Sequence, residues 1–260
     1  MNVFHQVVIR FSLRVDAWQE KVNGILSEEL RNRWFIYRVG LFCRTVLPSL
    51  LSQTKRLDRL VLLFDNEDKS LWKNYFEPLL KDLPFEVNPV FEGWNFSAEL
   101  QKLSNNISSS FTNLNQIRMD SDDLLSCDFI RKNEDILLNV GGYKYIVFPV
   151  GLRFDKCNWQ RLDYCDNPFL SYCVNRGEFH NILSINHEKV REFPFFLSAE
   201  SSFMWAQYVH DYNVSNKFRD LQTYDGFRSH PIQANDSFDF ALFGLNSQAL
   251  VSLFNLEGYK

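Results

Sequence analysis

Residues 114–123 read Leu-Asn-Gln-Ile-Arg-Met-Asp-Ser-Asp-Asp, so a partly apolar run passes directly into three carboxylates within four residues. The apolar residues of the first six positions predict a β-strand over 114–119. In α/β sheets, ligands bind beyond the carboxyl ends of the strands, which is where these carboxylates follow. The segment therefore predicts both a strand of such a sheet and the position of a functional site.

The chain before this segment alternates between short apolar runs and helical patterns. Strands alternating with helices at this spacing imply an α/β fold with a mainly parallel sheet and helices on both faces. We expect strands over 4–10, 60–65 and 85–91, and helices over 34–53 (broken at Pro48), 70–81 and 97–109 (with Ser97 as N-cap).

The second half of the chain has a different pattern. Gly141 and Gly142 are followed by apolar runs over 143–148 and 152–155, which predict a β-hairpin, and a further strand is expected over 167–174. No internal repeat or Pro/Gly-rich linker separates the halves. We therefore expect an antiparallel extension of one domain that spans residues 1–260.

Composition excludes several classes of protein. A chain of 260 residues that is 45% hydrophobic can bury a full core. Its 28 Lys and Arg against 32 Asp and Glu give a net charge of −4, and no basic run is present, so nucleic acid is not expected as the main partner.

The five cysteines are widely spaced and include no C-x-x-C pair, so neither a disulfide framework nor a zinc site is expected. No signal-like N-terminus or long apolar run occurs. These features predict a cytoplasmic protein with reduced thiols, with peripheral contact to the inner face of the membrane as an open alternative.

Asp120, Asp122 and Asp123 repel one another unless a cation neutralises them. A cluster with only hard oxygen ligands suits Mg²⁺ or Mn²⁺ that bridges to phosphate oxygens. The alternative is a solvated acidic turn in which Asp122 or Asp123 caps the following helix.

Several segments together resemble a bacterial family of rhamnosyltransferases, which are glycosyltransferases of the GT-A type. Residues 205–213 read Trp-Ala-Gln-Tyr-Val-His-Asp-Tyr-Asn and are similar to that family's W-x-Q-x-x-H-x-x-N stretch. The resemblance covers residues 5 to about 215. Its other segments are 5–12 (HQVVIRFS), 38–54 (from RVGLF through LPSL to QT), 60–65 (LVLLFD) and 118–123 (RMDSDD).

The resemblance implies a GT-A-like fold and roles for the acidic residues. Asp65 would accept hydrogen bonds from the nucleobase or ribose of a nucleotide sugar, unless it only forms a turn. Asp120 would face the ribose and Asp122 would be the main metal ligand. Asp123 would support the metal or contact the sugar, as part of the catalytic machinery. Residues 1–123 would then bind the nucleotide sugar and residues 124–260 the acceptor.

Basic residues are implied at the same site. Arg118 and Asp120 are two residues apart on a strand and point to one face, so Arg118 would balance the acids or bind the diphosphate; a structural salt bridge is the alternative. Arg10 and Arg38 would lie near the diphosphate, unless they pair with surface acids. His210 would supply a nitrogen ligand to the metal. The alternative is that His210 has only a structural role.

An inverting transfer needs a carboxylate base beside the acceptor hydroxyl. Glu200 is our candidate, ahead of Asp163 and Asp166, although a helix-capping or solvent-exposed glutamate would look the same. Trp205 would stack on a sugar face or pack in the core.

The resemblance implies transfer of a sugar, such as rhamnose, from a UDP- or dTDP-linked donor to a glycan or lipid-linked glycan in surface polysaccharide synthesis. Two other classes fit the acidic cluster. One is a nucleotide- or glycan-binding protein without turnover, which would lack an acceptor-side base. The other is a metal-dependent phosphoryl-transfer enzyme or hydrolase, which would release phosphate from simple esters.

Overall fold

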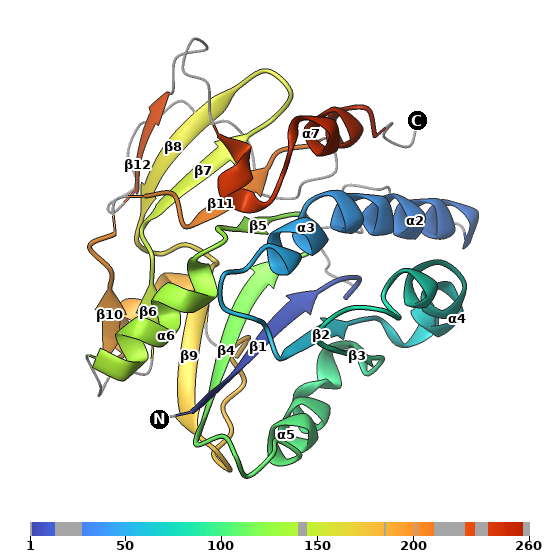
Figure 1. Ribbon diagram of the computed structural model, residues 1–260. Coiled ribbons are helices and arrows are strands. Elements are labelled where there is room, and N and C mark those ends of the chain that lie inside the picture. Colours follow the sequence, from blue (N-terminus) through green and yellow to red (C-terminus); the bar gives the residue numbers. More distant parts are fainter. Residues whose placement is uncertain are drawn as a thin grey trace.

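The computed structural model describes residues 2–13, 28–139, 145–184, 186–200, 202–210, 227–231 and 239–256. Within these residues the chain forms two β-sheets, and the helix α2 (Glu28–Arg44) lies between them (Figure 1). One side of α2 places Phe35 and Phe42 in the core of the larger sheet, and the other places Tyr37 and Leu41 in the core of the smaller sheet.

The strands β1, β2, β3 and β4 of the larger sheet all run parallel to one another. β9 is antiparallel to β4 and to β6, and β10 is parallel to β6. The expected α/β class, with a mainly parallel sheet, is confirmed. Among the described residues the sheet has seven strands, in the spatial order β10 (Phe195–Leu197), β6 (Tyr145–Val147), β9 (Leu170–Asn175), β4 (Asn113–Asp120), β1 (Val3–Arg10), β2 (Arg59–Leu63) and β3 (Glu86–Val90).

Helices cover both faces of the larger sheet, as expected. One face packs against α2, α3 (Val46–Leu51), α4 (Lys69–Leu71) with the π-helical turn η2 (Trp72–Phe76), and α6 (Phe129–Asn139). The other face packs against α5 (Ser97–Asn105) and the 3₁₀ segment η5 (His187–Glu192). Both faces are buried, so β1 and β2 are buried along almost their whole length. β2 is apolar after Arg59, whereas β1 carries His5 and Gln6 among its apolar residues.

The smaller sheet is mixed, and α7 (Ser247–Phe254) packs against it (Figure 1). β7 pairs antiparallel with β8 and parallel with β11, while β5 is antiparallel to β11. In the described part of the chain its five strands follow the order β12 (Phe227–Pro231), β8 (Trp159–Tyr164), β7 (Val150–Phe154), β11 (Trp205–Tyr208) and β5 (Leu124–Leu125).

The hairpin predicted over 143–148 and 152–155 is wrong. The first run forms β6 in the larger sheet and the second forms β7 in the smaller sheet, and residues 143 and 144 lie outside the described residues. The hairpin in this region joins β7 to β8. The strand expected over 167–174 is present as β9.

Three helix details also differ from the prediction. The long helix breaks at Thr45, and Pro48 lies in the first turn of α3, where a missing backbone N–H costs no intrahelical hydrogen bond. The helix expected over 70–81 is divided into α4, η2 and the 3₁₀ turn η3 (Glu77–Leu79). Ser97 is the first residue of α5, and Phe96 occupies the N-cap position.

All five cysteines are free. Among the described residues, no helix combines the length and apolar character needed to cross a membrane.

Candidate active site

The C-terminal ends of the parallel strands bring the first pair of predicted site residues together. Arg10 of β1 and Asp120 of β4 are direct neighbours in the strand register. Arg10 Nη2 donates to Asp120 Oδ1 at 2.9 Å. Although burial opposes the effect, Arg10 and Arg118 lower the pKa of Asp120 below its ordinary value. Asp120 is therefore a carboxylate at neutral pH, and its side chain is about one third exposed (34%).

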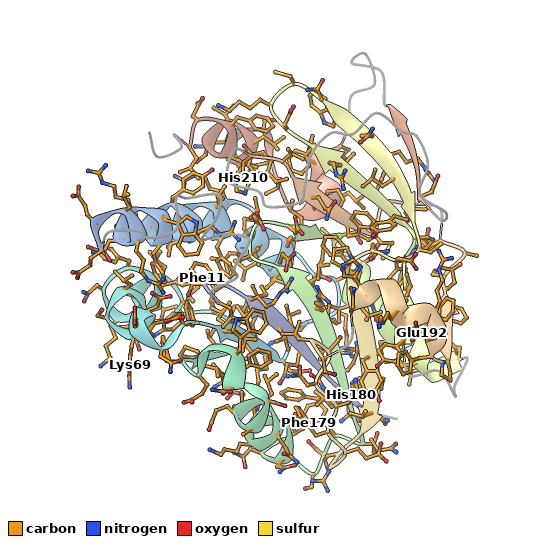
Figure 2. The ribbon with its side chains drawn as sticks, turned by 180° about the vertical axis from the view of Figure 1, so that it is seen from behind. Phe11, Lys69, Phe179, His180, Glu192 and His210 are labelled. Atoms are coloured by element: carbon orange, nitrogen blue, oxygen red, sulfur yellow. The ribbon has the colours of Figure 1, made fainter. Side chains whose placement is uncertain are left out.

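Asp122 is held from two sides by residues distant in the sequence. Arg38 Nη1 on α2 lies 2.9 Å from Asp122 Oδ2, and His210 Nε2, just after β11, lies 2.8 Å from the same oxygen. Burial opposes ionisation, but the charge of Arg38 and the hydrogen bond with His210 hold the pKa of Asp122 well below its ordinary value. Figure 2 labels His210 beside α2, where its ring contacts the ring of Tyr37 at 5.9 Å between centroids.

Asp123 is fully buried, and neither of its carboxylate oxygens has a hydrogen-bond partner among the residues that the structure describes. Burial, together with the neighbouring charges of Asp122 and Asp120, raises the pKa of Asp123 well above its ordinary value. Buried polar groups without partners are rare in folded proteins and call for an explanation such as a bound ion or a catalytic role. Asp123 is thus prepared to accept a cation or hydrogen-bond donors.

Three arginines, Arg10, Arg38 and Arg118, lie near the three aspartates. Arg118 is buried near Arg10, and its Nε has no hydrogen-bond partner within the described part of the chain. Burial, followed by the charge of Arg10, lowers the pKa of Arg118 to about 10, so it remains a cation at neutral pH. The guanidinium groups of Arg10, Arg38 and Arg118 therefore offset the repulsion among the carboxylates even without a metal, a role that the sequence analysis considered for Arg118 alone.

Asp65 caps the short 3₁₀ turn η1 (Asn66–Asp68) that follows β2. Its Oδ1 accepts from the backbone N–H of Glu67 at 3.2 Å. The turn-forming role is therefore present, and it is compatible with a second role toward a ligand. A cavity of about 340 Å³ opens beside this turn, at the ends of β2 and β3, and is lined by Asn66, Lys69, Pro89, Val90, Phe91, Glu92 and Glu99.

The predicted base is not joined to this cluster by any contact among the described residues. The Glu200 carboxylate binds Lys132 of α6 and accepts from Ser202 Oγ at 2.7 Å. The other two candidates form ion pairs elsewhere: Asp163 with Arg161 at 3.2 Å and Asp166 with Arg191 at 2.7 Å.

Trp205 packs in the core and does not present a sugar-binding face. Its ring is fully buried and stacks on Phe169 at 4.7 Å, and its Nε1 donates to the carbonyl of Phe148.

Two contributors to the site were missed by the sequence analysis. Ser121 Oγ accepts a hydrogen bond from Arg38. Arg153 on β7 is nearly buried, donates to Gln207 Oε1 at 2.8 Å, and its charge partly opposes the rise in the pKa of Asp123. The available signal was an arginine between Leu152 and Phe154 in a predicted strand, because a buried arginine needs a charged or polar partner.

Comparisons with solved structures found weak likenesses. The structure of S. aureus TarS residues 1–349 in complex with UDP has a TM-score of 0.43 and 10% identity, over 80% of this chain and 61% of that one. A nucleotide-diphospho-sugar transferase from Desulfovibrio desulfuricans G20, titled putative, has a TM-score of 0.39 and 12% identity, over 80% and 81% of the two chains. The 4-diphosphocytidyl-2C-methyl-D-erythritol synthase of Anaerococcus prevotii has a TM-score of 0.36 and 9% identity, over 81% of this chain and 90% of that one.

No curated protein matches the chain. The family described as putative rhamnosyl transferase matches residues 5–220, a span that contains the acidic cluster, the arginines that face it, and His210. The chain belongs to this family and is a glycosyltransferase.

Proposed function

We propose that the protein transfers a sugar, such as rhamnose, from a nucleoside-diphosphate donor to a hydroxyl group of a glycan or lipid-linked glycan. The observation that carries the proposal is the buried carboxyl group of Asp123, beside Asp122 at the end of β4, for which the described ranges of the chain supply no hydrogen-bond partner. The charges of Arg38 and Arg153 also act on Asp123, so an anionic ligand and a cation can be accommodated together.

Arg10 and Arg118 suit the donor diphosphate. Both are cations at the strand ends, and Arg118 retains an unpartnered Nε that a phosphate oxygen can accept from. A planar guanidinium binds two phosphate oxygens at once. In the proposed arrangement Asp65 and Asp120 accept hydrogen bonds from the nucleoside, which we take to be uridine or thymidine.

The residues present fit a divalent cation. Mg²⁺ is usually bound by one or two carboxylates together with substrate phosphates, and the unpartnered oxygens of Asp123 beside Asp122 meet this requirement. No three His, Cys, Asp or Glu side chains within the described ranges form a group that could hold a metal alone. Asp122 and Asp123 would hold Mg²⁺ or Mn²⁺, with His210 as a further ligand once it leaves Asp122. When bound, the ion would act as a Lewis acid that stabilises charge on the leaving diphosphate.

Glu200 remains our candidate for the base of an inverting reaction. Lys132 holds its carboxylate, so Glu200 must release Lys132 before it can take a proton from an acceptor hydroxyl. In this proposal residues 1–123 bind the donor and residues 124–260 bind the acceptor, on the cytoplasmic face of a membrane where surface polysaccharide is assembled.

The first test is thermal denaturation of the wild type and Asp122→Asn with UDP, dTDP and GDP, each with and without Mn²⁺. At a ligand concentration of about 100 times Kd, binding should raise the Tm of the wild type by about 5 °C. We expect the increase to require nucleotide and metal together and to vanish in Asp122→Asn, because the metal loses a charged ligand.

Asp82→Asn is the matched control, since it makes the same chemical change at an exposed aspartate. It should respond like the wild type. If no nucleotide raises the Tm, or if Asp122→Asn responds like the control, the proposal is refuted.

A further inference from the structure

Arg31, in the first turns of α2, makes a bidentate contact with a buried carboxylate that the proposed function does not use. Arg31 Nε lies 2.9 Å and Nη2 lies 2.7 Å from Asp68 Oδ1. The Asp68 side chain is about 1% exposed, whereas that of Arg31 is 17% exposed. The pair therefore fixes the beginning of α2 to the turn η1 that follows β2.

The same carboxylate is fixed from a second direction. Ser12 Oγ, just after β1, donates to Asp68 Oδ2 at 2.5 Å, and the backbone N–H of Ser12 donates to the carbonyl of Leu63 in β2. Burial raises the pKa of Asp68, while Ser12 and Arg31 oppose this rise. Asp68 thus joins the ends of β1 and β2 to the helix α2, and it leaves the guanidinium of Arg31 little freedom to move.

Arg31 also reaches the residue that we assign to the nucleoside. Its Nη2 lies 3.6 Å from Asp65 Oδ1, the oxygen that accepts from the N–H of Glu67. Asp65 and Asp68 stand at the two ends of the same turn, and Arg31 lies between them. Asp68 provides the buried anchor, and Asp65, with 16% of its side chain exposed, is the more accessible of the two.

We propose that Arg31 is a positioning residue that holds the Asp65 carboxylate for hydrogen bonding to the nucleoside of the donor. The inference rests on the proposed function, because it takes Asp65 to be the group that contacts the nucleoside. Arg31 acts through Asp65 and makes no contact with the ligand. Lysine cannot replace it, because an ammonium group is a point charge and cannot bind Asp68 through two nitrogens while it also faces Asp65.

The test is a double-mutant cycle of Arg31→Lys and Asp65→Asn, with affinities for UDP, dTDP and inorganic pyrophosphate measured by calorimetry in the presence of Mn²⁺. Arg31→Lys should weaken the better-bound nucleotide about tenfold and leave pyrophosphate unchanged, because pyrophosphate lacks a nucleoside. In the Asp65→Asn background, Arg31→Lys should cause no further loss. Arg33→Lys, on the same helix but exposed, is the matched control and should bind like the wild type.

A loss that adds to that of Asp65→Asn, or that affects pyrophosphate equally, would overturn the positioning role. If Asp65→Asn binds nucleotide as tightly as the wild type, the positioning role is also overturned, but the proposed function still stands. Absence of nucleotide binding in the wild type would refute the proposed function and the inference with it.

Ser12→Ala gives a second measurement if Arg31→Lys does not fold. It removes one hydrogen bond from Asp68 and keeps the Arg31 contact. It should weaken nucleotide binding severalfold, again without effect in the Asp65→Asn background, and an unchanged affinity would contradict the inference.

Discussion

At the scale of single residues, His5 is a further buried ionisable group, and it lies in β1 away from the strand end that forms the site. Its side chain is fully buried, its Nδ1 lies 3.2 Å from Asn115 Nδ2, and its Nε2 lies 3.6 Å from Glu134 Oε1. Lys55 pairs with the same glutamate at 2.7 Å. Burial lowers the pKa of His5 to about 4, although Glu134 acts in the opposite direction.

This pKa predicts a loss of stability in mild acid. Between pH 6.5 and 4 the unfolded chain binds a proton at His5 and the folded chain does not, so stability is lost as the pH falls through this range. The loss at pH 4 should reach about 3 kcal/mol, from about 1.4 kcal/mol for each unit of pKa difference. Denaturant titrations of the wild type and His5→Gln should diverge below pH 6.5 and run parallel above pH 7. Equal acid sensitivity in both proteins would contradict this account.

Sequence reasoning identified the acidic residues because a strand end is a local feature, and Asp120 follows the strand directly. Their partners are distant in the chain: Arg38 and His210 lie 84 and 88 residues from Asp122. Both were found through a family resemblance, since no periodicity relates residues so far apart. Arg31 and Asp68, 37 residues apart, belong to no such motif and could be found only from the folded structure.

At the scale of elements, the contact between β7 and β11 depends on a glycine. A Cβ atom on Gly151 would lie 2.3 Å from the indole ring of Trp205. The ring cannot move aside, because it stacks on Phe169 and its Nε1 donates to the carbonyl of Phe148.

We therefore expect Gly151→Ala to destabilise the protein by about 3 kcal/mol, since overpacking in a closed core forces strain. The Tm should fall by roughly 10 °C. Gly40→Ala in α2 is the matched control: its Cβ would meet only the flexible ends of Arg44 and Leu256, at 3.3 Å. Alanine also favours a helix, so Gly40→Ala should not lose stability. Similar losses in the two variants would exclude the indole contact as the cause.

The false hairpin prediction shows where element-level reasoning fails. The residues of β6 and β7 are both buried, and only Phe148 and Pro149 lie between the strands. Two adjacent apolar runs look like paired strands in the sequence. Which sheet each run joins depends on partners further along the chain, β9 for β6 and β11 for β7, together with the hairpin between β7 and β8. The parallel strands were predicted correctly because each is separated from the next by a helical segment.

At the scale of the whole molecule, the two sheets share one apolar cluster, in addition to the clusters that belong to each sheet alone. Leu162 of β8 and Trp205 of β11 pack in the same cluster as the apolar residues of β1, β2 and β4. α2 contributes to this cluster and to the core of the smaller sheet. Unfolding of either sheet would expose the apolar surface of the other, so we expect one cooperative transition.

Native-state hydrogen exchange can measure this cooperativity. The amides of Val7 in β1 and Leu152 in β7 should exchange with the same opening free energy and the same dependence on denaturant. Leu253 in the terminal helix α7 is a useful reference, because local opening there should need less free energy. A clearly lower opening free energy for Leu152 than for Val7 would show that the smaller sheet unfolds by itself.

One of the points at which the chain passes from the larger sheet to the smaller one restricts how this protein can change in evolution. β4 ends at Asp120 and β5 begins at Leu124, so three residues form this connection, and two of them are aspartates of the site. One inserted residue would shift β5 against β11 and turn its buried leucines to the opposite face. We therefore expect insertions and deletions to be rare between β4 and β5 in related sequences. The β7–β8 turn over 155–158 can vary in length.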